Sequence, residues 1–188
     1  MWAPTGPPRS TRRSTGAGGS SIQPRAVLSR ISQAKNRMEG PAAFADGSWN
    51  PRDEQIGKHK ALVSQAVKLF GTRQFDHYDL LLSLTEKMGG IGLEHHRSSE
   101  NSRNPDYFTK WDENDSERGL LPHELVHSWN GKYRRPDKLW TPDYRTPMQD
   151  NLLWVYEGQT SYWDLVLAGR SGMQSKEMIL AEWATHAG

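Results

Sequence analysis

The 188-residue sequence contains no cysteine and no long apolar run. Without cysteine there is no disulfide framework, no thiolate metal site and no cysteine nucleophile, while the cellular compartment stays open. No segment approaches the roughly 18–20 apolar residues that cross a bilayer, which excludes a membrane-spanning protein. Hydrophobic residues make up only 35% of the chain and its mean hydropathy is −0.83. We therefore expect a small core, or a segment that contributes nothing to the core.

Acidic residues are missing from residues 1–38, which carry seven Lys or Arg side chains. The rest of the chain holds 17 basic and 22 acidic residues, so the net charge of +2 reflects this first segment. Gly, Pro, Ser and Arg dominate residues 1–40, a composition that buries too little apolar surface to fold. We expect residues 1–40 to be a disordered or non-native basic leader. The segment lacks the apolar core of a secretory signal. Its basic residues are not interleaved with aromatic residues, so we expect no nucleic-acid binding.

Hydrophobic periodicity in the remaining chain predicts an α+β fold, mostly helical with a short N-terminal β region. Extended segments are expected at 75–84 and 90–99, whereas the polar residues 97–116 indicate an irregular stretch. Glycines that follow periodic segments predict helix ends at Gly71 and Gly169, and Ser175 is expected to cap a last short helix. The expected longer helices are 53–70, 120–130 and 150–169.

The strongest chemical signal is the motif His123-Glu124-Leu125-Val126-His127. On a helix, residues four apart differ by about 40° in direction and 6 Å in rise, so both imidazoles face one point. Two neutral imidazoles on one face suit Zn²⁺, and the intervening Glu124 can act as a general base. The alternative is a coincidental histidine pair on a surface helix. The apolar residues that flank the pair argue against full exposure.

A catalytic zinc needs a third protein ligand, and Glu157 is the best candidate. It lies among aromatic residues, where an unpaired carboxylate would be costly to bury, although a solvent-facing helix position is the alternative. Co²⁺ or Mn²⁺ can occupy similar sites, so the metal identity stays open. Weaker candidates for the third ligand are Asp150, Glu177 and His186. Residues that follow Glu157 on one helix face can orient a ligand imidazole; these are Thr160, Ser161 and Asp164.

Three separated segments, GGIGLEHHRSS (89–99), LLPHELVHSWNGKYRRP (120–136) and LWTPDYRTPMQDNLLWVYEGQTSYW (139–163), together resemble the catalytic domain of the glycyl aminopeptidases. These enzymes are gluzincins, and the resemblance runs over about residues 45–187. It implies a thermolysin-like gluzincin core with one Zn²⁺ per chain, held by His123, His127 and Glu157. Glu124 would be the general base. Members of the family are several times longer, so residues 41–188 are expected to be a truncated part of the zinc metallopeptidase catalytic domain.

The same resemblance places Glu94 where these aminopeptidases hold the free α-amino group of the substrate. A carboxylate near the metal gives a cationic N-terminus a charge-assisted partner, although an exposed edge-strand charge is the ordinary alternative. Gly90 and Gly92 would keep this backbone accessible for pairing with the peptide. Related enzymes supply a tyrosine for the oxyanion. Tyr133, Tyr144 and Tyr162 are available, but none of them matches a motif, so this donor is not assigned.

The sequence therefore predicts a zinc-dependent aminopeptidase that acts on peptides with a free N-terminus. The preference for small N-terminal residues, Gly or Ala, is implied only by the resemblance. Two alternatives remain open: an endopeptidase with the same zinc chemistry, and a truncated, inactive metallopeptidase-like domain that serves as a binding module. The oligomeric state, the exact peptide and the localisation are not determined by the sequence.

Overall fold

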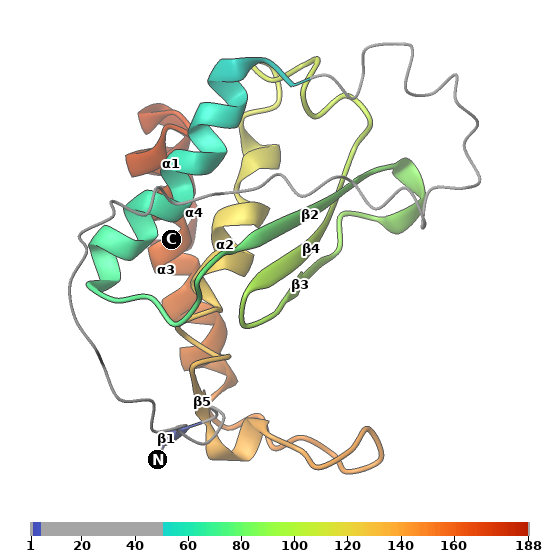
Figure 1. Ribbon diagram of the computed structural model, residues 1–188, viewed down its shortest axis with the longest axis vertical. Coiled ribbons are helices and arrows are strands. Elements are labelled where there is room, and N and C mark those ends of the chain that lie inside the picture. Colours follow the sequence, from blue (N-terminus) through green and yellow to red (C-terminus); the bar gives the residue numbers. More distant parts are fainter. Residues whose placement is uncertain (1, 5–50, 188) are drawn as a thin grey trace, which may run out of the picture.

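The computed structural model of the chain describes residues 2–4 and 51–187 as helices, strands and connecting turns (Figure 1). The helices are α1 (Asp53–Phe70), α2 (Leu120–Val126), α3 (Leu153–Ser171) and α4 (Lys176–Ala187). The strands are β1 (Trp2–Pro4), β2 (Asp79–Leu84), β3 (Gly92–Glu94), β4 (Ser98–Arg103) and β5 (Arg134–Pro136). Single 3₁₀ turns are η2 (Glu86–Met88), η3 (Ser116–Arg118) and η4 (Asp137–Leu139). The mixture of helices with a small sheet confirms the α+β prediction.

The predicted leader falls almost entirely outside the described residues. Its first residues form β1, which pairs antiparallel with β5, and residues 5–40 are not described. The division of the chain into a leader and a domain from residue 41 therefore stays a prediction.

The main sheet has the strand order β2-β4-β3, with β4 parallel to β2 and antiparallel to β3. Alternate residues of β2 are buried, namely Leu80, Leu82 and Leu84. The central strand β4 lies inside the stretch expected to be irregular, so that expectation was wrong. Part of its buried polar surface is hydrogen-bonded: Asn101 Nδ2 donates to Ser99 O at 3.2 Å and, across to β2, to Leu81 O at 3.2 Å, whereas Asn101 Oδ1 and Ser102 Oγ have no partner among the described residues. A polar sequence can form a central strand when such bonds offset the cost of burial.

Some of the helices begin or end where the sequence predicts, and others do not. Gly71, at φ 70°, ends α1 as predicted, and the Ser175 hydroxyl accepts a hydrogen bond from Met178 N at the start of α4. Helix α3 continues past Gly169 and ends at Gly172, at φ 72°, so the predicted end was wrong. Helix α2 is shorter than expected: after Val126 the chain passes into tighter turns, in which Ser128 N donates to Leu125 O and Trp129 N to Val126 O, three residues back instead of four.

Helix α2 occupies the centre of the molecule, in contact with α1, α3, β3 and β4 (Figure 1). Its residues Leu121, Leu125 and Val126 are fully buried. A short helix with few backbone hydrogen bonds is held mainly by such packing. The two histidines and the glutamate of its motif are therefore carried on a rigid element. The core also includes residues of the other elements, among them Leu62, Ala66, Leu80, Tyr107, Trp111, Leu167 and Met173.

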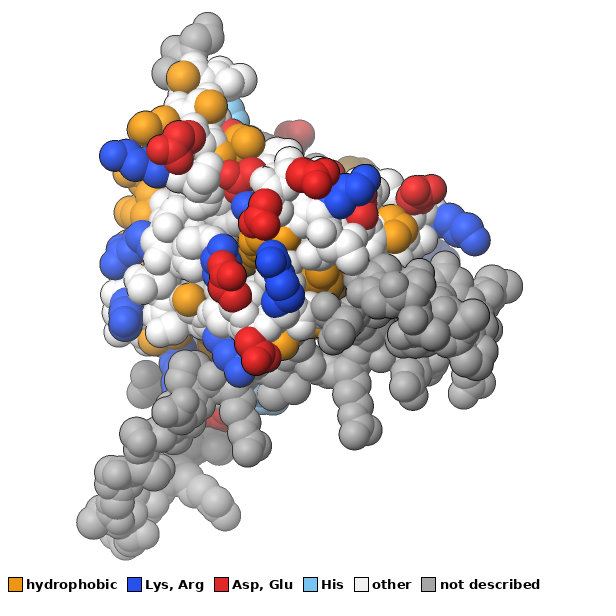
Figure 2. Space-filling view, turned by 90° about the horizontal axis from the view of Figure 1, so that it is seen from above, with side chains coloured by type: hydrophobic (Ala, Val, Ile, Leu, Met, Phe, Trp, Pro, Cys, Tyr) orange, Lys and Arg blue, Asp and Glu red, His pale blue; other side chains and the backbone are white. Residues whose placement is uncertain are grey.

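Acidic and basic side chains are interspersed on the face that Figure 2 shows. Partly exposed ion pairs join Lys58 with Glu54 at 2.9 Å on α1, and Lys110 with Asp106 at 3.0 Å in the turns after β4. Within the described part of the chain, no helix combines the length and apolar character that a bilayer crossing requires.

Candidate metal centre

Helices α2 and α3 bring His123, His127 and Glu157 together. The two Nε2 atoms lie 3.2 Å apart, and Glu157 Oε2 lies 3.3 Å from His123 Nε2 and 3.4 Å from His127 Nε2. The packing of α2 against α3 supplies this meeting, because Glu157 is thirty residues away in sequence. Three ligand atoms of the types that bind transition metals thus converge on one point.

The other nitrogen of each imidazole has its own acceptor. His123 Nδ1 lies 2.7 Å from Asp164 Oδ2, and His127 Nδ1 lies 3.0 Å from the carbonyl oxygen of Asn130. An acceptor at Nδ1 favours the tautomer with the proton there, which leaves the lone pair on Nε2. Two lone pairs and a carboxylate oxygen then face one another, an arrangement that repels itself unless a cation lies between them.

The distances fit a zinc ion. Ligand atoms bound at ~2.0–2.1 Å in a tetrahedron lie about 3.3 Å from one another. The three observed separations are 3.2, 3.3 and 3.4 Å. A His₂Glu set also leaves the fourth tetrahedral position open, which distinguishes catalytic from purely structural zinc sites. The residues present therefore fit this metal without rearrangement.

The surroundings shift the pKa values of the two imidazoles in opposite directions. Burial acts to lower the pKa of His123, but the hydrogen bond and charge of Asp164 outweigh it and raise that pKa. Burial lowers the pKa of His127, whose acceptor is a neutral carbonyl. Among the three residues expected to orient an imidazole, Asp164 contacts His123 directly, and Thr160 Oγ1 lies 3.4 Å from His127 Nδ1. Ser161 instead donates to Glu157 O within its own helix.

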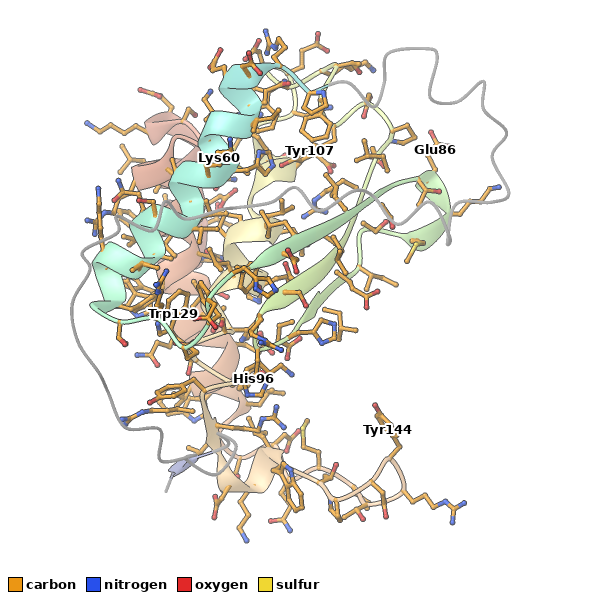
Figure 3. The ribbon with its side chains drawn as sticks, in the orientation of Figure 1. Lys60, Glu86, His96, Tyr107, Trp129 and Tyr144 are labelled. Carbon is orange, nitrogen blue, oxygen red and sulfur yellow. The ribbon has the colours of Figure 1, made fainter. Side chains whose placement is uncertain are left out.

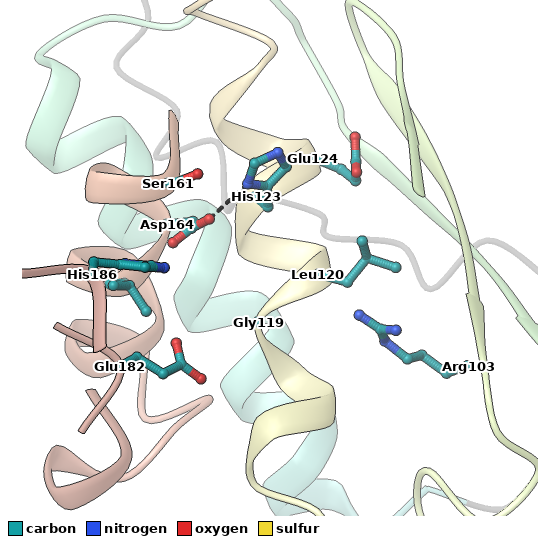
Figure 4. A pocket seen from close by; sticks show the side chains of 10 residues that line it. Arg103, Gly119, Leu120, His123, Glu124, Ser161, Asp164, Glu182 and His186 are labelled. Carbon is teal, nitrogen blue, oxygen red and sulfur yellow. Dashed lines mark hydrogen bonds and ion pairs between the residues drawn. The ribbon is translucent and has the colours of Figure 1, made fainter. Parts of the chain in front are cut away.

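Glu124 follows His123 on α2, and the two side chains lie close together (Figure 4). Glu124 is 6% exposed, and burial raises the pKa of its carboxyl to about 7. Its carboxylate packs against the backbone of Gly92. A Cβ atom at position 92 would lie 2.6 Å from Glu124 Cδ, closer still to Oε1, and 2.7 Å from Leu120 Cδ1. The absence of a side chain at Gly92 therefore makes room for Glu124, a role that the sequence did not suggest.

Glu94 ends the edge strand β3 and is held by two partners. Tyr156 donates its hydroxyl hydrogen to Glu94 Oε1 at 2.5 Å, and Lys132 Nζ lies 3.2 Å from the same oxygen. Burial acts to raise the pKa of Glu94, but these partners outweigh it and lower that pKa to about 2. Tyr156 also stacks on the His127 ring, with centroids 4.5 Å apart. Tyr156 thus links the predicted amine-binding carboxylate to the metal-ligand cluster.

Sequence reasoning missed Tyr156 and Lys132. The only available signal for Tyr156 was its position next to Glu157, and the contact with Glu94 spans 62 residues. Of the tyrosines considered for the oxyanion, Tyr144 lies on the loop that projects away from the helices (Figure 3), and Tyr162 is half exposed. The weaker ligand candidates do not join the cluster of three; they are Asp150, Glu177 and His186.

Comparisons with known proteins show which family and which solved structure the chain is similar to. Residues 116–188 match the model of the M61 glycyl aminopeptidase family. The solved structure of an aminopeptidase N family protein from Idiomarina loihiensis is similar to the chain, with a TM-score of 0.58 and 27% sequence identity. The similarity covers 66% of this chain and 22% of that one, so this chain spans about a fifth of that protein's length. No curated protein matches the chain.

The predicted relationship to the glycyl aminopeptidases is thereby confirmed. The family match contains His123, Glu124, His127 and Glu157, whereas the segment 89–99 with Glu94 precedes it.

Proposed function

We propose that this chain is the zinc-binding core of an aminopeptidase with a gluzincin fold, which removes small N-terminal residues such as Gly or Ala from peptides. The observation that carries the proposal is the convergence of His123, His127 and Glu157 at tetrahedral edge distances, next to a buried Glu124. The similarity to peptidases over two-thirds of the chain supports the same reaction class. The size preference rests only on the family resemblance.

His123, His127 and Glu157 would hold the metal, and Asp164 and Asn130 O would fix the orientation of the imidazoles. Zinc bound by such residues supplies Lewis acidity and makes water a stronger acid near neutral pH. Glu124 would accept the proton of the attacking water and then deliver it to the nitrogen of the departing amine. Its burial against Gly92 keeps the carboxylate in one place for both transfers.

Glu94 would bind the α-ammonium group of the substrate. Both of its partners contact Oε1, so the carboxylate retains acceptor capacity on its other oxygen. The outer edge of β3 is not paired within the described sheet, which would let an extended peptide lie alongside it. Tyr156 would keep Glu94 in position.

One contact favours a second function. The ammonium group of Lys132 already partly neutralises the Glu94 carboxylate. This contact does not hinder an endopeptidase of the same zinc chemistry, because an endopeptidase does not bind a free α-amino group. N-terminal blocking separates the two functions. An aminopeptidase hydrolyses a free glycyl tetrapeptide and not its N-acetylated form, whereas an endopeptidase hydrolyses both.

The experiment measures the release of glycine and of larger products from both peptides by the zinc-loaded chain. Glu124→Gln is the catalytic control, since it keeps the size of the side chain and removes the base. We expect hydrolysis of the free peptide only, and its loss in the variant. A chain that binds zinc and cleaves neither peptide would contradict the enzyme proposal and favour a binding module.

A further inference from the structure

A second charged group lies in the pocket that opens beside His123 and Glu124. This pocket has a volume of about 350 Å³, within the usual range of ~300–1,000 Å³ for small-ligand sites. Its walls come from α2, α3, α4 and the end of β4, and Arg103 lies at the end of β4 (Figure 4). In that view Leu120 lies between Glu124 and Arg103.

Arg103 lacks the partners that a buried guanidinium usually has. Its side chain is 14% exposed, and among the described residues its Nε has no hydrogen-bond acceptor. The nearest carboxylate oxygen, on Glu117, is 3.9 Å from Nε, and the other oxygen of Glu117 accepts from Asn104 Nδ2. A guanidinium stays charged under these conditions and offers donors in a planar fork that matches a carboxylate.

Two of the three acidic side chains of the pocket have other partners: Asp164 accepts from His123, and Glu182 lies 3.2 Å from Gln174 Nε2. Within the described part of the chain, neither these two nor Glu124 forms an ion pair with Arg103, whose one carboxylate neighbour there is Glu117. The pocket is thus lined by one proposed metal ligand, His123, together with Glu124, and by an incompletely paired cation, Arg103.

We propose that Arg103 binds a carboxylate of the peptide substrate on the leaving-group side of the scissile bond. Leu120, which lies between Glu124 and Arg103 in Figure 4, is one helical turn from Glu124, about 6 Å along the axis, and two extended peptide residues span a distance of this order. The carboxylate is either the C-terminus of a di- or tripeptide or the acidic side chain of the residue after the scissile bond. The inference rests on the proposed function in one respect: a peptidase reaction defines which side of the bound peptide is the leaving-group side.

The test compares substrates that differ only in this charge. Glycyl-leucine and glycyl-leucyl-leucine are measured against their C-terminal amides, and glycyl-glutamyl amide is measured against glycyl-glutaminyl amide. We expect kcat/KM to be about tenfold or more higher for the acid of at least one pair, as for a hydrogen bond to a charged group. The pair that shows the preference identifies the source of the carboxylate.

Variants attribute the preference to Arg103. In Arg103→Gln the acid-to-amide ratio should fall to about one, and Arg103→Lys should retain part of it. The exposed Arg170→Gln is the matched control and should keep the parental ratio. Equal rates for acid and amide in all three pairs of the parent would overturn the proposal, as would an unchanged ratio in a folded Arg103→Gln.

Binding to the metal-free chain separates this inference from the proposed function. The affinity of the same acids and amides is measured by calorimetry in the presence of a chelator. If the parent hydrolyses nothing but binds the acid more tightly, and Arg103→Gln does not, the carboxylate site stands and the peptidase proposal fails. If it hydrolyses peptides but shows no acid preference in either assay, the site fails and the peptidase stands.

Discussion

The replacement of Gly92 by alanine tests whether the position of Glu124 controls the reaction. The new Cβ would lie 2.6 Å from Glu124 Cδ and closer still to Oε1, and ordinary contacts begin at 3.4 Å, so the carboxylate must retreat by at least 0.8 Å. The backbone of β3 cannot easily yield, because Leu93 and Glu100 are paired in the sheet. A misplacement of about 1 Å costs on the order of 100-fold in rate, and we expect that loss in kcat for a free glycyl peptide.

The control is Gly57→Ala, in the middle of α1, where an added Cβ meets nothing within 4 Å. That substitution should leave kcat unchanged and stabilise the helix by about 0.5–1 kcal/mol. Zinc content is measured for both variants, because the atoms nearest to a Cβ at position 92 belong to Glu124 and Leu120 rather than to the three ligands, and the metal should therefore be retained. A Gly92→Ala variant with full zinc content and parental kcat would refute the role assigned to Glu124.

Two further predictions concern the surroundings of the site and the core. Asp164→Asn should weaken zinc affinity by about 10–100-fold in a competition titration, because His123 loses its anionic acceptor. Ser161→Ala is the control and should keep the parental affinity. An Asp164→Asn variant that binds zinc as tightly as the parent would contradict the assignment. Burial lowers the pKa of His59 to about 4 in the folded protein. Between about pH 6.5 and pH 4 the unfolded chain therefore binds more protons than the folded chain. The stability that this neutral histidine allows above pH 6.5 is lost as the pH falls through that range. In chelator, the unfolding free energy should drop by about 2 kcal/mol from this group between pH 7 and pH 5, and His59→Gln should show a correspondingly smaller drop in urea titrations. An identical drop in both proteins would exclude His59 as its source.

The helical motif could be predicted from sequence because its geometry is local. Residues i and i+4 face the same point on any helix, so His123 and His127 needed no tertiary information. Glu157 was identified by its apolar neighbours and by resemblance, and its distance from the histidines follows from the packing of α2 against α3. The choice of Asp164 over Ser161 as the imidazole acceptor depended on the rotation of α3, which the sequence leaves open.

The parts that sequence reasoning missed depend on long-range contacts. Strand β4 is polar, and its buried Ser99 and Asn101 are stabilised by neighbouring strands rather than by hydrophobic alternation. The contact of Tyr156 with Glu94 joins α3 to the edge strand. Gly92 was assigned to peptide pairing, because nothing in the sequence shows that a carboxylate from another element lies against it.

The central claim is that His123, His127 and Glu157 bind one metal ion together. Metal content per chain, measured on the purified protein after zinc loading and dialysis, tests it most directly beside Glu157→Ala, with Glu177→Ala as the control on α4. We predict about one zinc per chain in the parent and in the control, and a clear loss in Glu157→Ala. A folded parent without zinc, or a Glu157→Ala variant that retains it as tightly as the parent, would contradict the account.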